Sequence, residues 1–364
     1  MKTILLMTAV FALTCAAQQK GAPKGPPPPP MMDCGAHGEI EILCGARSPE
    51  DIEATPDGKF LIVPQFVGGG GGRGRGGPST PAVMEIFDLA KKTYSVIPVT
   101  NDARAKDSRD AWGDSSCPGP IGDALVGHGI SLAKRNGGAW ELYVVNHGGM
   151  RQSIEMFELK QNAGAWGLIW HGCVVSQKDF NDVAALADGS FIATHPTALQ
   201  TPGMDLFSGV PSGYVARWTA AKGEEEIPGT RVGYPNGVLV SADGRYMYLN
   251  AWTAKEVHKY DLKTGKELKV IKLDFMPDNI TWTPKRQILA AGVKGARGNC
   301  GDTPCNLAFG IAQIDPAKME AKTVFDSAGK GALIGGVSVG YELGSSIYIG
   351  AFQGDRVVKI PAPK

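Results

Sequence analysis

Two histidines, His128 and His147, stand at the outer ends of two short apolar runs separated by Asn136-Gly137-Gly138. Asn-Gly-Gly between two strand-like runs is typical of a tight hairpin turn that needs positive backbone dihedrals. An antiparallel hairpin would bring both histidines back to the same edge of a sheet. Two adjacent imidazoles can act as a general base and its partner if the rest of the chain supplies a substrate pocket and an electrophile.

The surrounding chain repeats a pattern of paired strand-like runs. Six hairpins share a polar or glycine start, a run, a turn and a second run, and they begin at Asp51, His128, Asn181, Asn236, Asp278 and Gly335. A third run follows each hairpin, starting at Val83, Ile154, Tyr214, Val257, Gly310 and Arg356. Four strands repeated six times predict an all-β fold, a six-bladed β-propeller over residues 38–364. Because the sixth repeat stops after its third strand, we expect Gly38–Leu43 to complete the last blade.

Polar residues recur at the start of the first strand of each repeat. In a propeller these strands line a central channel, so side chains at the same register converge there. The converging residues are Glu50, Asp51, His128, Asn181, Asp182, Asn236, Asp278 and Asn279. Taken singly, Asn or Asp before a strand can simply cap a turn. Together, carboxylates and carboxamides without a cation would be costly to desolvate, and such hard oxygen ligands suit Ca²⁺.

Six short motifs carry a family resemblance from about Glu39 onward. They are P-E-D-I-E at Pro49, H-G-I-S at His128, V-V-N-H at Val144, F-N-D-V at Phe180, P-N-G-V at Pro235 and P-D-N-I at Pro277. In this order, and with the histidine pair, the sequence resembles the paraoxonases. These are calcium-dependent arylesterases and lactonases within the gluconolactonase-like and strictosidine-synthase-like six-bladed propellers. The resemblance implies a small-molecule ester or lactone substrate.

The resemblance also implies two calcium ions and a histidine dyad. A catalytic Ca²⁺ would be held by Glu50, Asn181, Asn236, Asp278 and Asn279. A structural Ca²⁺ would be held by Asp51, Asp182 and the backbone carbonyl of Ile130. His128 would activate water and His147 would orient it, although a metal-bound carboxylate such as Asp278 is a competing candidate for the base.

The ends of the second strands are expected to form the mouth of the channel. They carry Phe66, His147, His195, Trp252 and Phe352, which give apolar surface for a hydrophobic substrate. Phe66 and Trp252 could equally pack between blades. Two other functions remain open, a gluconolactonase-like sugar lactonase and a non-enzymatic binding propeller that calcium stabilises.

Composition and the N-terminal segment indicate where the protein works. A net charge of +1 with 20% charged residues argues against a nucleic-acid surface or a polybasic membrane patch. Residues 1–17 read as a signal peptide, with lipidation of Cys15 as an alternative, and residues 18–37 read as a proline-rich disordered spacer. Gly68–Gly77 reads as a flexible loop between strands. We therefore expect an exported protein without a membrane-spanning segment.

Six cysteines remain after removal of the predicted signal peptide, and an even number in an exported chain favours disulfides. Cys300 with Cys305 and Cys34 with Cys44 are the predicted pairs. The match of Gly336–Gly340 to G-x-S-x-G is judged accidental. It lies in a strand-like run, and no histidine follows it in the chain.

Overall fold

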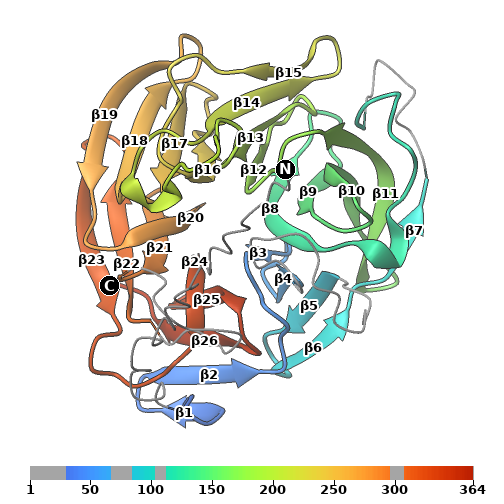
Figure 1. Ribbon diagram of the computed structural model, residues 1–364. Helices are drawn as coiled ribbons and strands as arrows, with labels where there is room; N and C mark the ends of the chain where they lie inside the picture. Colours follow the sequence, from blue (N-terminus) through green and yellow to red (C-terminus); the bar gives the residue numbers. More distant parts are fainter. Residues whose placement is uncertain (1–29, 67–83, 103–111, 296–306, 364) are drawn as a thin grey trace, which may run out of the picture.

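The strand-like runs form six sheets, antiparallel except at one edge strand, around a central channel in the computed structural model (Figure 1). The structure describes residues 30–66, 84–102, 112–295 and 307–363. Each sheet is one blade, with its first strand beside the channel and its later strands farther out. The protein is therefore a six-bladed β-propeller, as predicted.

The first three blades follow one another along the chain. Blade 1 consists of β3 (Glu53–Ala54), β4 (Phe60–Pro64), β5 (Met84–Asp88) and β6 (Thr93–Val96). Blade 2 consists of β8 (Gly127–Lys134), β9 (Trp140–Asn146), β10 (Gln152–Asn162) and β11 (Ala165–Ser176), with β7 (Val99–Asn101) added parallel to β11. Blade 3 consists of β12 (Val183–Ala185), β13 (Phe191–His195), β14 (Tyr214–Thr219) and β15 (Gly223–Glu226).

The last three blades repeat this order. Blade 4 consists of β16 (Pro235–Val240), β17 (Tyr246–Ala251), β18 (Glu256–Asp261) and β19 (Lys266–Lys272). Blade 5 consists of β20 (Met276–Trp282), β21 (Ile288–Val293), β22 (Phe309–Asp315) and β23 (Glu320–Asp326). Blade 6 consists of β24 (Gly335–Leu343), β25 (Ser346–Gln353), β26 (Arg356–Pro361), β2 (Ile40–Cys44) and β1 (Gly35–His37).

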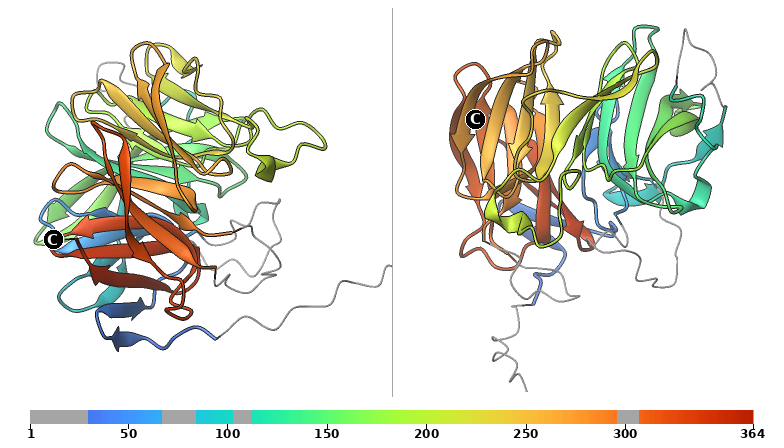
Figure 2. Two further views of the ribbon diagram at one scale, coloured as in Figure 1. Left: turned by 90° about the vertical axis from the view of Figure 1, so that its left-hand side faces the viewer. Right: turned by 45° about the horizontal axis from the view of Figure 1, so that its top comes forward.

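Two short 3₁₀ helices are present in the described residues. The helix η1 (Gly122–Ala124) precedes β8, and η2 (Leu206–Ser208) lies between β13 and β14. The left view of Figure 2 shows the loop that carries η2 projecting from one face of the ring. Among the described residues, no helix has the length and apolar character needed to cross a membrane.

The N-terminal strand closes the ring, as the repeat predicted. β2 pairs antiparallel with β26, with Ile42 opposite Val358. β1 extends this blade by one strand and lies in residues assigned to the spacer by sequence. The predicted Cys34–Cys44 disulfide is confirmed. Residues 1–17, most of the spacer, Gly68–Gly77, Cys300 and Cys305 lie outside the described residues.

Asp-Gly turns join the first two strands in three blades. The glycine of each turn has a positive φ, and its amide donates to the carbonyl three residues earlier at 2.8 Å, as seen for Gly58, Gly189 and Gly244. The turn between β8 and β9, predicted from Asn136-Gly137-Gly138, uses one positive φ. Only Gly138 has a positive φ there, and it donates to the Arg135 carbonyl at 2.8 Å. This is a longer turn that ends in a left-handed glycine.

The hydrophobic core lies between the faces of neighbouring blades. One cluster joins Ile42, Ile349 and Val358 of blade 6 to Leu289 and Ile311 of blade 5, and all five side chains are buried. The other clusters are similarly made of residues from successive sheets.

Truncation of Ile42 should destabilise the protein through the ring closure. Ile42 is 2% exposed, so Ile42→Ala leaves a cavity between blades and is expected to lower the free energy of unfolding by about 2–5 kcal/mol. Chemical denaturation measures this loss. Glu39→Ala, at an exposed position just before β2, is the control and should change stability little. A fully stable Ile42→Ala variant would contradict the closing role of β2.

Candidate active site in the central channel

The inner strands lose regular pairing where the candidate side chains lie. β8, β16 and β20 each have a register irregularity against the second strand, and the positions skipped are occupied by His128, Asn236 and Asp278–Asn279. β3 and β12 begin only after Asp51 and Asp182. Bulges of this kind re-aim side chains and leave backbone groups for other partners. Sequence patterning placed these residues at the channel but did not predict the interruptions.

Two buried aspartates use the freed backbone amides to link blades. Asp51 accepts from the Ile130 amide at 2.8 Å through Oδ2, and Asp182 accepts from the Val238 amide at 2.7 Å through Oδ2. The strands approach so closely that a Cβ on Gly129 would lie 2.5 Å from Asp182 Oδ1. The glycine after His128 is therefore required by packing. In the sequence, the glycines of H-G-I and N-G-V are the signal for this close approach of neighbouring strands.

Four oxygens at the predicted ligand positions are buried without a hydrogen-bond partner. They are Glu50 Oε2, Asn181 Oδ1, Asn236 Oδ1 and Asn279 Oδ1. Glu50 is 1% exposed and its other oxygen accepts from Asn279 Nδ2 at 3.0 Å. Buried acceptors left unpaired cost about 1–3 kcal/mol each. Four such oxygens, contributed by four blades, are therefore suited to binding a cation.

The carboxyl groups are strongly perturbed. Burial raises the pKa of Glu50 to about 8, against the smaller lowering effect of the Asn279 hydrogen bond. Burial, followed by the Glu50 charge, raises the pKa of Asp51 well above its usual range. Burial and the Asp51 charge do the same for the pKa of Asp182. A cation among these groups would reverse each of these trends because it favours the ionised form.

The two histidines meet as the hairpin predicted. His128 Nδ1 lies 2.8 Å from His147 Nε2. His128 Nε2 lies 3.5 Å from Glu50 Oε1, at the edge of the oxygen cluster. Burial lowers the pKa of His128 to about 3 and that of His147 to about 4, with the neighbouring His128 as a second cause for the latter. Both rings are thus neutral near pH 7, which leaves one nitrogen of each with a lone pair.

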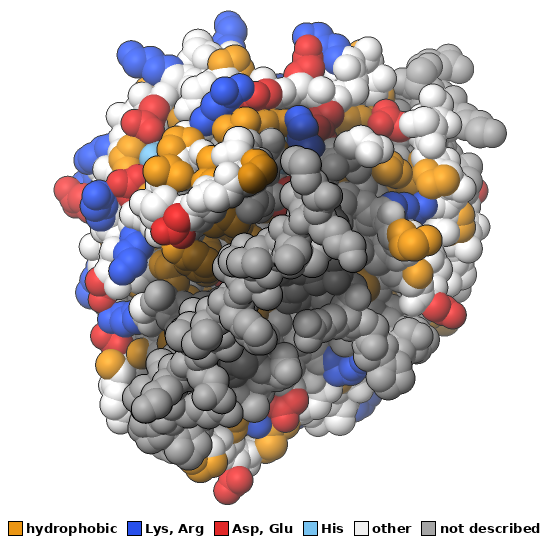
Figure 3. All heavy atoms as spheres, viewed as in Figure 1, with side chains coloured by type: hydrophobic (Ala, Val, Ile, Leu, Met, Phe, Trp, Pro, Cys, Tyr) orange, Lys and Arg blue, Asp and Glu red, His pale blue; other side chains and the backbone are white. Residues whose placement is uncertain are grey.

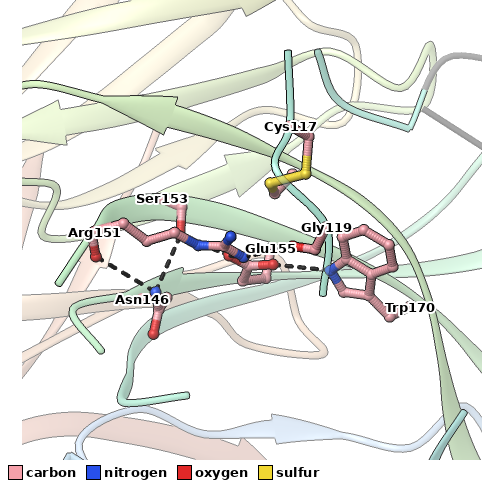
Figure 4. Close-up of a disulfide and its surroundings, with 8 residues drawn as sticks. Cys117, Gly119, Asn146, Arg151, Ser153, Glu155 and Trp170 are labelled. Atoms are coloured by element: carbon pink, nitrogen blue, oxygen red, sulfur yellow. Dashed lines mark hydrogen bonds and ion pairs between the residues drawn. A yellow bond between two sulfur atoms is a disulfide. The ribbon is translucent and has the colours of Figure 1, made fainter. Parts of the chain in front are cut away.

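A buried network holds the turn that carries His147 (Figure 4). Asn146 Oδ1 accepts from the Val126 amide at 3.0 Å and from the Gly148 amide at 2.9 Å, so it ties together the approaches to both histidines. Its Nδ2 donates to Ser153 Oγ at 3.0 Å. Ser153 in turn donates to Glu155, which is fully buried and also accepts from Arg151 Nη2 at 2.7 Å.

A disulfide fastens the segment before β8 to the same blade. Cys117 is bonded to Cys173 in β11, and Figure 4 shows this bridge beside the Glu155 network. The cysteine spacing alone left this pair unassigned. Nearby, Gly113 packs so closely that a Cβ would lie 2.4 Å from the Cys173 carbonyl. Both contacts hold the segment before β8 against β11.

The predicted pocket residues differ in their surroundings. Phe66 stacks on His128 with ring centroids 4.1 Å apart and meets His147 edge-on at 5.8 Å. Trp252 contacts the rings of Tyr234 and Phe207, while Phe352 packs close to Gly336.

His195 is fully buried, bonds the Asp179 carbonyl at 2.8 Å and packs against the Phe180 ring. It therefore presents no surface to a ligand.

Figure 3 shows charged side chains of both signs around the rim of the face seen in Figure 1, with hydrophobic side chains nearer the centre.

Three residues of the channel region were missed by sequence reasoning. Gln152 contacts His147, and its Oε1 lies 2.6 Å from Nδ1 of that ring. Asn250 donates to the Asp278 carbonyl at 2.7 Å. Glu53 accepts from the Leu132 amide at 3.1 Å and borders a cavity of about 280 Å³ that reaches Asp51 but neither histidine. The signal for Gln152 was its mirror position to His147 across G-G-M-R.

The match of Gly336–Gly340 to G-x-S-x-G has a structural role that is not catalytic. This segment lies within β24, and Ser338 is fully buried and donates to the Glu50 carbonyl. A nucleophilic serine needs an exposed strand-to-helix elbow. Ser338 instead fixes the backbone of Glu50.

Fold and site together define a class, a six-bladed propeller whose channel gathers buried oxygens beside a histidine pair. A family model described as Arylesterase matches residues 117–355, more than half of the chain. The chain therefore belongs to the arylesterase family.

Two relatives show how far the sequence likeness extends. Serum paraoxonase/lactonase 3 of Homo sapiens is 28% identical over 237 residues, which cover 61% of this chain and 65% of the human protein. The protein of the same name from Oryctolagus cuniculus is 28% identical over 309 residues, 77% of each chain. The match to the human protein thus spans just under two thirds of its length.

Solved structures support the fold. A gluconolactonase from Xanthomonas campestris superposes with a TM-score of 0.51 at 14% identity, covering 94% of this chain and 99% of that one. A luciferin-regenerating enzyme gives a TM-score of 0.50 at 13% identity, covering 89% and 95%. Identities this low speak for the propeller architecture alone.

The oxygen cluster suits the calcium implied by the family resemblance. In the described part of the chain, no three His, Cys, Asp or Glu side chains are grouped closely enough to hold a metal by themselves. The candidate set does not need such a group, because most of its oxygens come from the amides of Asn181, Asn236 and Asn279. Amide and carboxylate oxygens are hard ligands that calcium accepts and that zinc or copper sites seldom use.

Calcium should stabilise the folded protein if these oxygens bind it. We expect the melting temperature to rise with added Ca²⁺ and fall with a chelator, since a ligand at 100 times its Kd stabilises by about 2.7 kcal/mol. Asn236→Ala removes one unpaired oxygen and should weaken this calcium dependence. Asn101→Ala, exposed at the end of β7, is the matched control and should keep it. Equal melting temperatures with calcium and with chelator would contradict cation binding.

Proposed function

We propose that the protein is a calcium-dependent hydrolase of carboxylic esters and lactones. The single observation that carries the proposal is that the bonded His128–His147 pair lies 3.5 Å from Glu50, whose other carboxylate oxygen is buried without a partner. A purely structural cation site has no need of a histidine pair at its edge. Membership of the arylesterase family supports the hydrolase class.

The channel residues divide into two candidate calcium sites. Glu50, Asn181, Asn236, Asp278 and Asn279 would hold one ion. Asp51, Asp182 and the Ile130 carbonyl would hold the other. Calcium at the first site would supply a Lewis acid for the substrate carbonyl and for the negative charge that develops on its oxygen.

The histidines would move the proton. His128 Nε2 faces the Glu50 side of the channel at 3.5 Å, so it is the nitrogen placed to take a proton from an attacking water. His147 bonds the opposite nitrogen of that ring at 2.8 Å and would orient it. Phe66, stacked on His128, excludes water from one face of the ring and offers an apolar contact to the substrate.

Hydrophobic esters and lactones fit the aromatic surroundings. We propose Phe66, Trp252 and Phe352 as substrate contacts and leave out His195 because it is fully buried.

Export from the cytoplasm is supported by two disulfides and by the signal-like composition of residues 1–17. Residues 38–364 would then act as one catalytic propeller.

A substrate panel tests the proposed reaction directly. Aryl esters, aliphatic lactones, acyl-homoserine lactones and sugar lactones are assayed with added calcium and after chelation. We expect turnover of the hydrophobic members, and a loss of more than about 100-fold on chelation. Preference for sugar lactones would favour the gluconolactonase-like alternative. No turnover of any member, with calcium bound, would favour a binding propeller.

Replacement of His128 tests the base. His128→Gln keeps a polar side chain but cannot accept a proton, so kcat should fall by about 100- to 10,000-fold. KM and the calcium dependence of the melting temperature should change little, because the oxygen cluster is retained. His37→Gln, on β1 away from the channel, is the control. Full turnover of His128→Gln would move the base role to another group such as Asp278.

A further inference from the structure

A tight turn places Gln152 directly opposite His147. Gly149 and Met150 have φ values of 59° and 57°, and the Arg151 amide donates to the Gly148 carbonyl at 3.2 Å. These are the features of a type I′ hairpin turn, which fixes the register of its strands. Asn146 pairs with Ser153 in that register, so the next pair towards the turn is His147 with Gln152. Their side chains therefore stand side by side at the end of the sheet.

The backbone leaves little freedom at this turn. A Cβ on Gly148 would lie 1.7 Å from the Ala124 carbonyl, so the residue after His147 must be glycine. Gln152 is the first residue of β10 and pairs with Ser176 across the blade. The Asn146–Ser153 side-chain bond at 3.0 Å locks the adjacent pair. Gln152 is thus held in place by the strand itself.

The contact between the two side chains determines which nitrogen carries the proton. Gln152 Oε1 lies 2.6 Å from His147 Nδ1. A carboxamide oxygen can only accept, so Nδ1 of His147 must be the donor. In the neutral ring Nε2 then has the lone pair, and at 2.8 Å it accepts from His128 Nδ1. His128 is left with its own lone pair on Nε2, the nitrogen 3.5 Å from Glu50 Oε1.

We propose that Gln152 is a positioning residue that sets the tautomer of both histidines, so that His128 presents a lone pair to the channel. A general base must have its lone pair on the nitrogen that faces the water. Without an acceptor beside His147 Nδ1, either tautomer of the pair satisfies the contact between the rings. Gln152 removes that ambiguity with a neutral group, so the buried pair gains no extra charge.

The alternative keeps the same contacts but reverses the direction of each hydrogen bond. If the amide were rotated so that its nitrogen faced His147, every proton in the chain would shift by one position. His128 would then carry its proton on Nε2, pointing towards Glu50, and would be unable to accept one from water. The two arrangements differ in which ring nitrogens are protonated, which nuclear magnetic resonance observes directly.

Two-bond ¹H–¹⁵N correlation spectra of the labelled full chain at neutral pH give the tautomers. We expect the rings of His128 and His147, assigned by their Gln variants, to show protonated Nδ1 and unprotonated Nε2. Gln152→Leu should convert this pattern into a mixture, and Gln152→Glu should retain it because an acceptor oxygen is kept. Protonated Nε2 in the wild type, or unchanged spectra in Gln152→Leu, would overturn the proposal.

Kinetics provide the second arm, which rests on the proposed hydrolase function. Gln152→Leu should lower kcat by about 10-fold, the effect of losing one hydrogen bond, with KM unchanged. Gln152→Glu should restore most of the loss. Gln161→Leu, at the exposed end of the same strand, is the matched control and should keep wild-type turnover.

The two arms separate the possible failures. Tautomers as expected in a protein without turnover would disprove the hydrolase function and leave the positioning role standing. Normal turnover by Gln152→Leu, with the control also active, would disprove the positioning role alone. A parallel fall of kcat in Gln152→Leu and Gln152→Glu, with unchanged spectra, would assign Gln152 to packing and also overturn the proposal.

Discussion

Buried negative and partially negative oxygens at the start of the inner strands are the constraint on which the rest of the site depends. Glu50, Asp51 and Asp182 are almost fully buried, and burial raises the pKa of each of these carboxyls. Backbone amides satisfy the two aspartates, whereas Glu50 Oε2 and three asparagine oxygens have no partner. An arrangement so costly in the absence of a cation is understandable if the fold exists to bind one.

The irregular backbone of the inner strands makes this gathering possible. Regular pairing would direct successive side chains to opposite faces, but the interruptions in β8, β16 and β20 allow neighbouring residues such as Asp278 and Asn279 to take part in one cluster. Glycines at 129 and 237 let adjacent strands approach within contact of one another's backbone. The propeller therefore uses its least regular segments where its chemistry is concentrated, and leaves its regular strands to the packing between blades.

Blade 2 contributes the histidines and most of the support for them. Its hairpin turn, the Asn146 and Glu155 network and the Cys117–Cys173 disulfide fix both rings from outside the channel. Gln152 extends this support to the protons of the rings. The oxygen cluster and the histidine pair thus come from different blades, and they meet where His128 Nε2 lies 3.5 Å from Glu50 Oε1.

The sequence by itself determined the all-β repeat, the closing strand, the Cys34–Cys44 bridge and the meeting of His128 with His147. These follow from local periodicity and turn composition, which act over a few residues. Only the tertiary structure decided which oxygens stay unpaired, that His195 is buried and that Cys117 joins Cys173. Those facts depend on bulges, on close strand approach and on side-chain directions set by neighbouring blades. Such distances between residues far apart in the chain are not encoded in any local pattern.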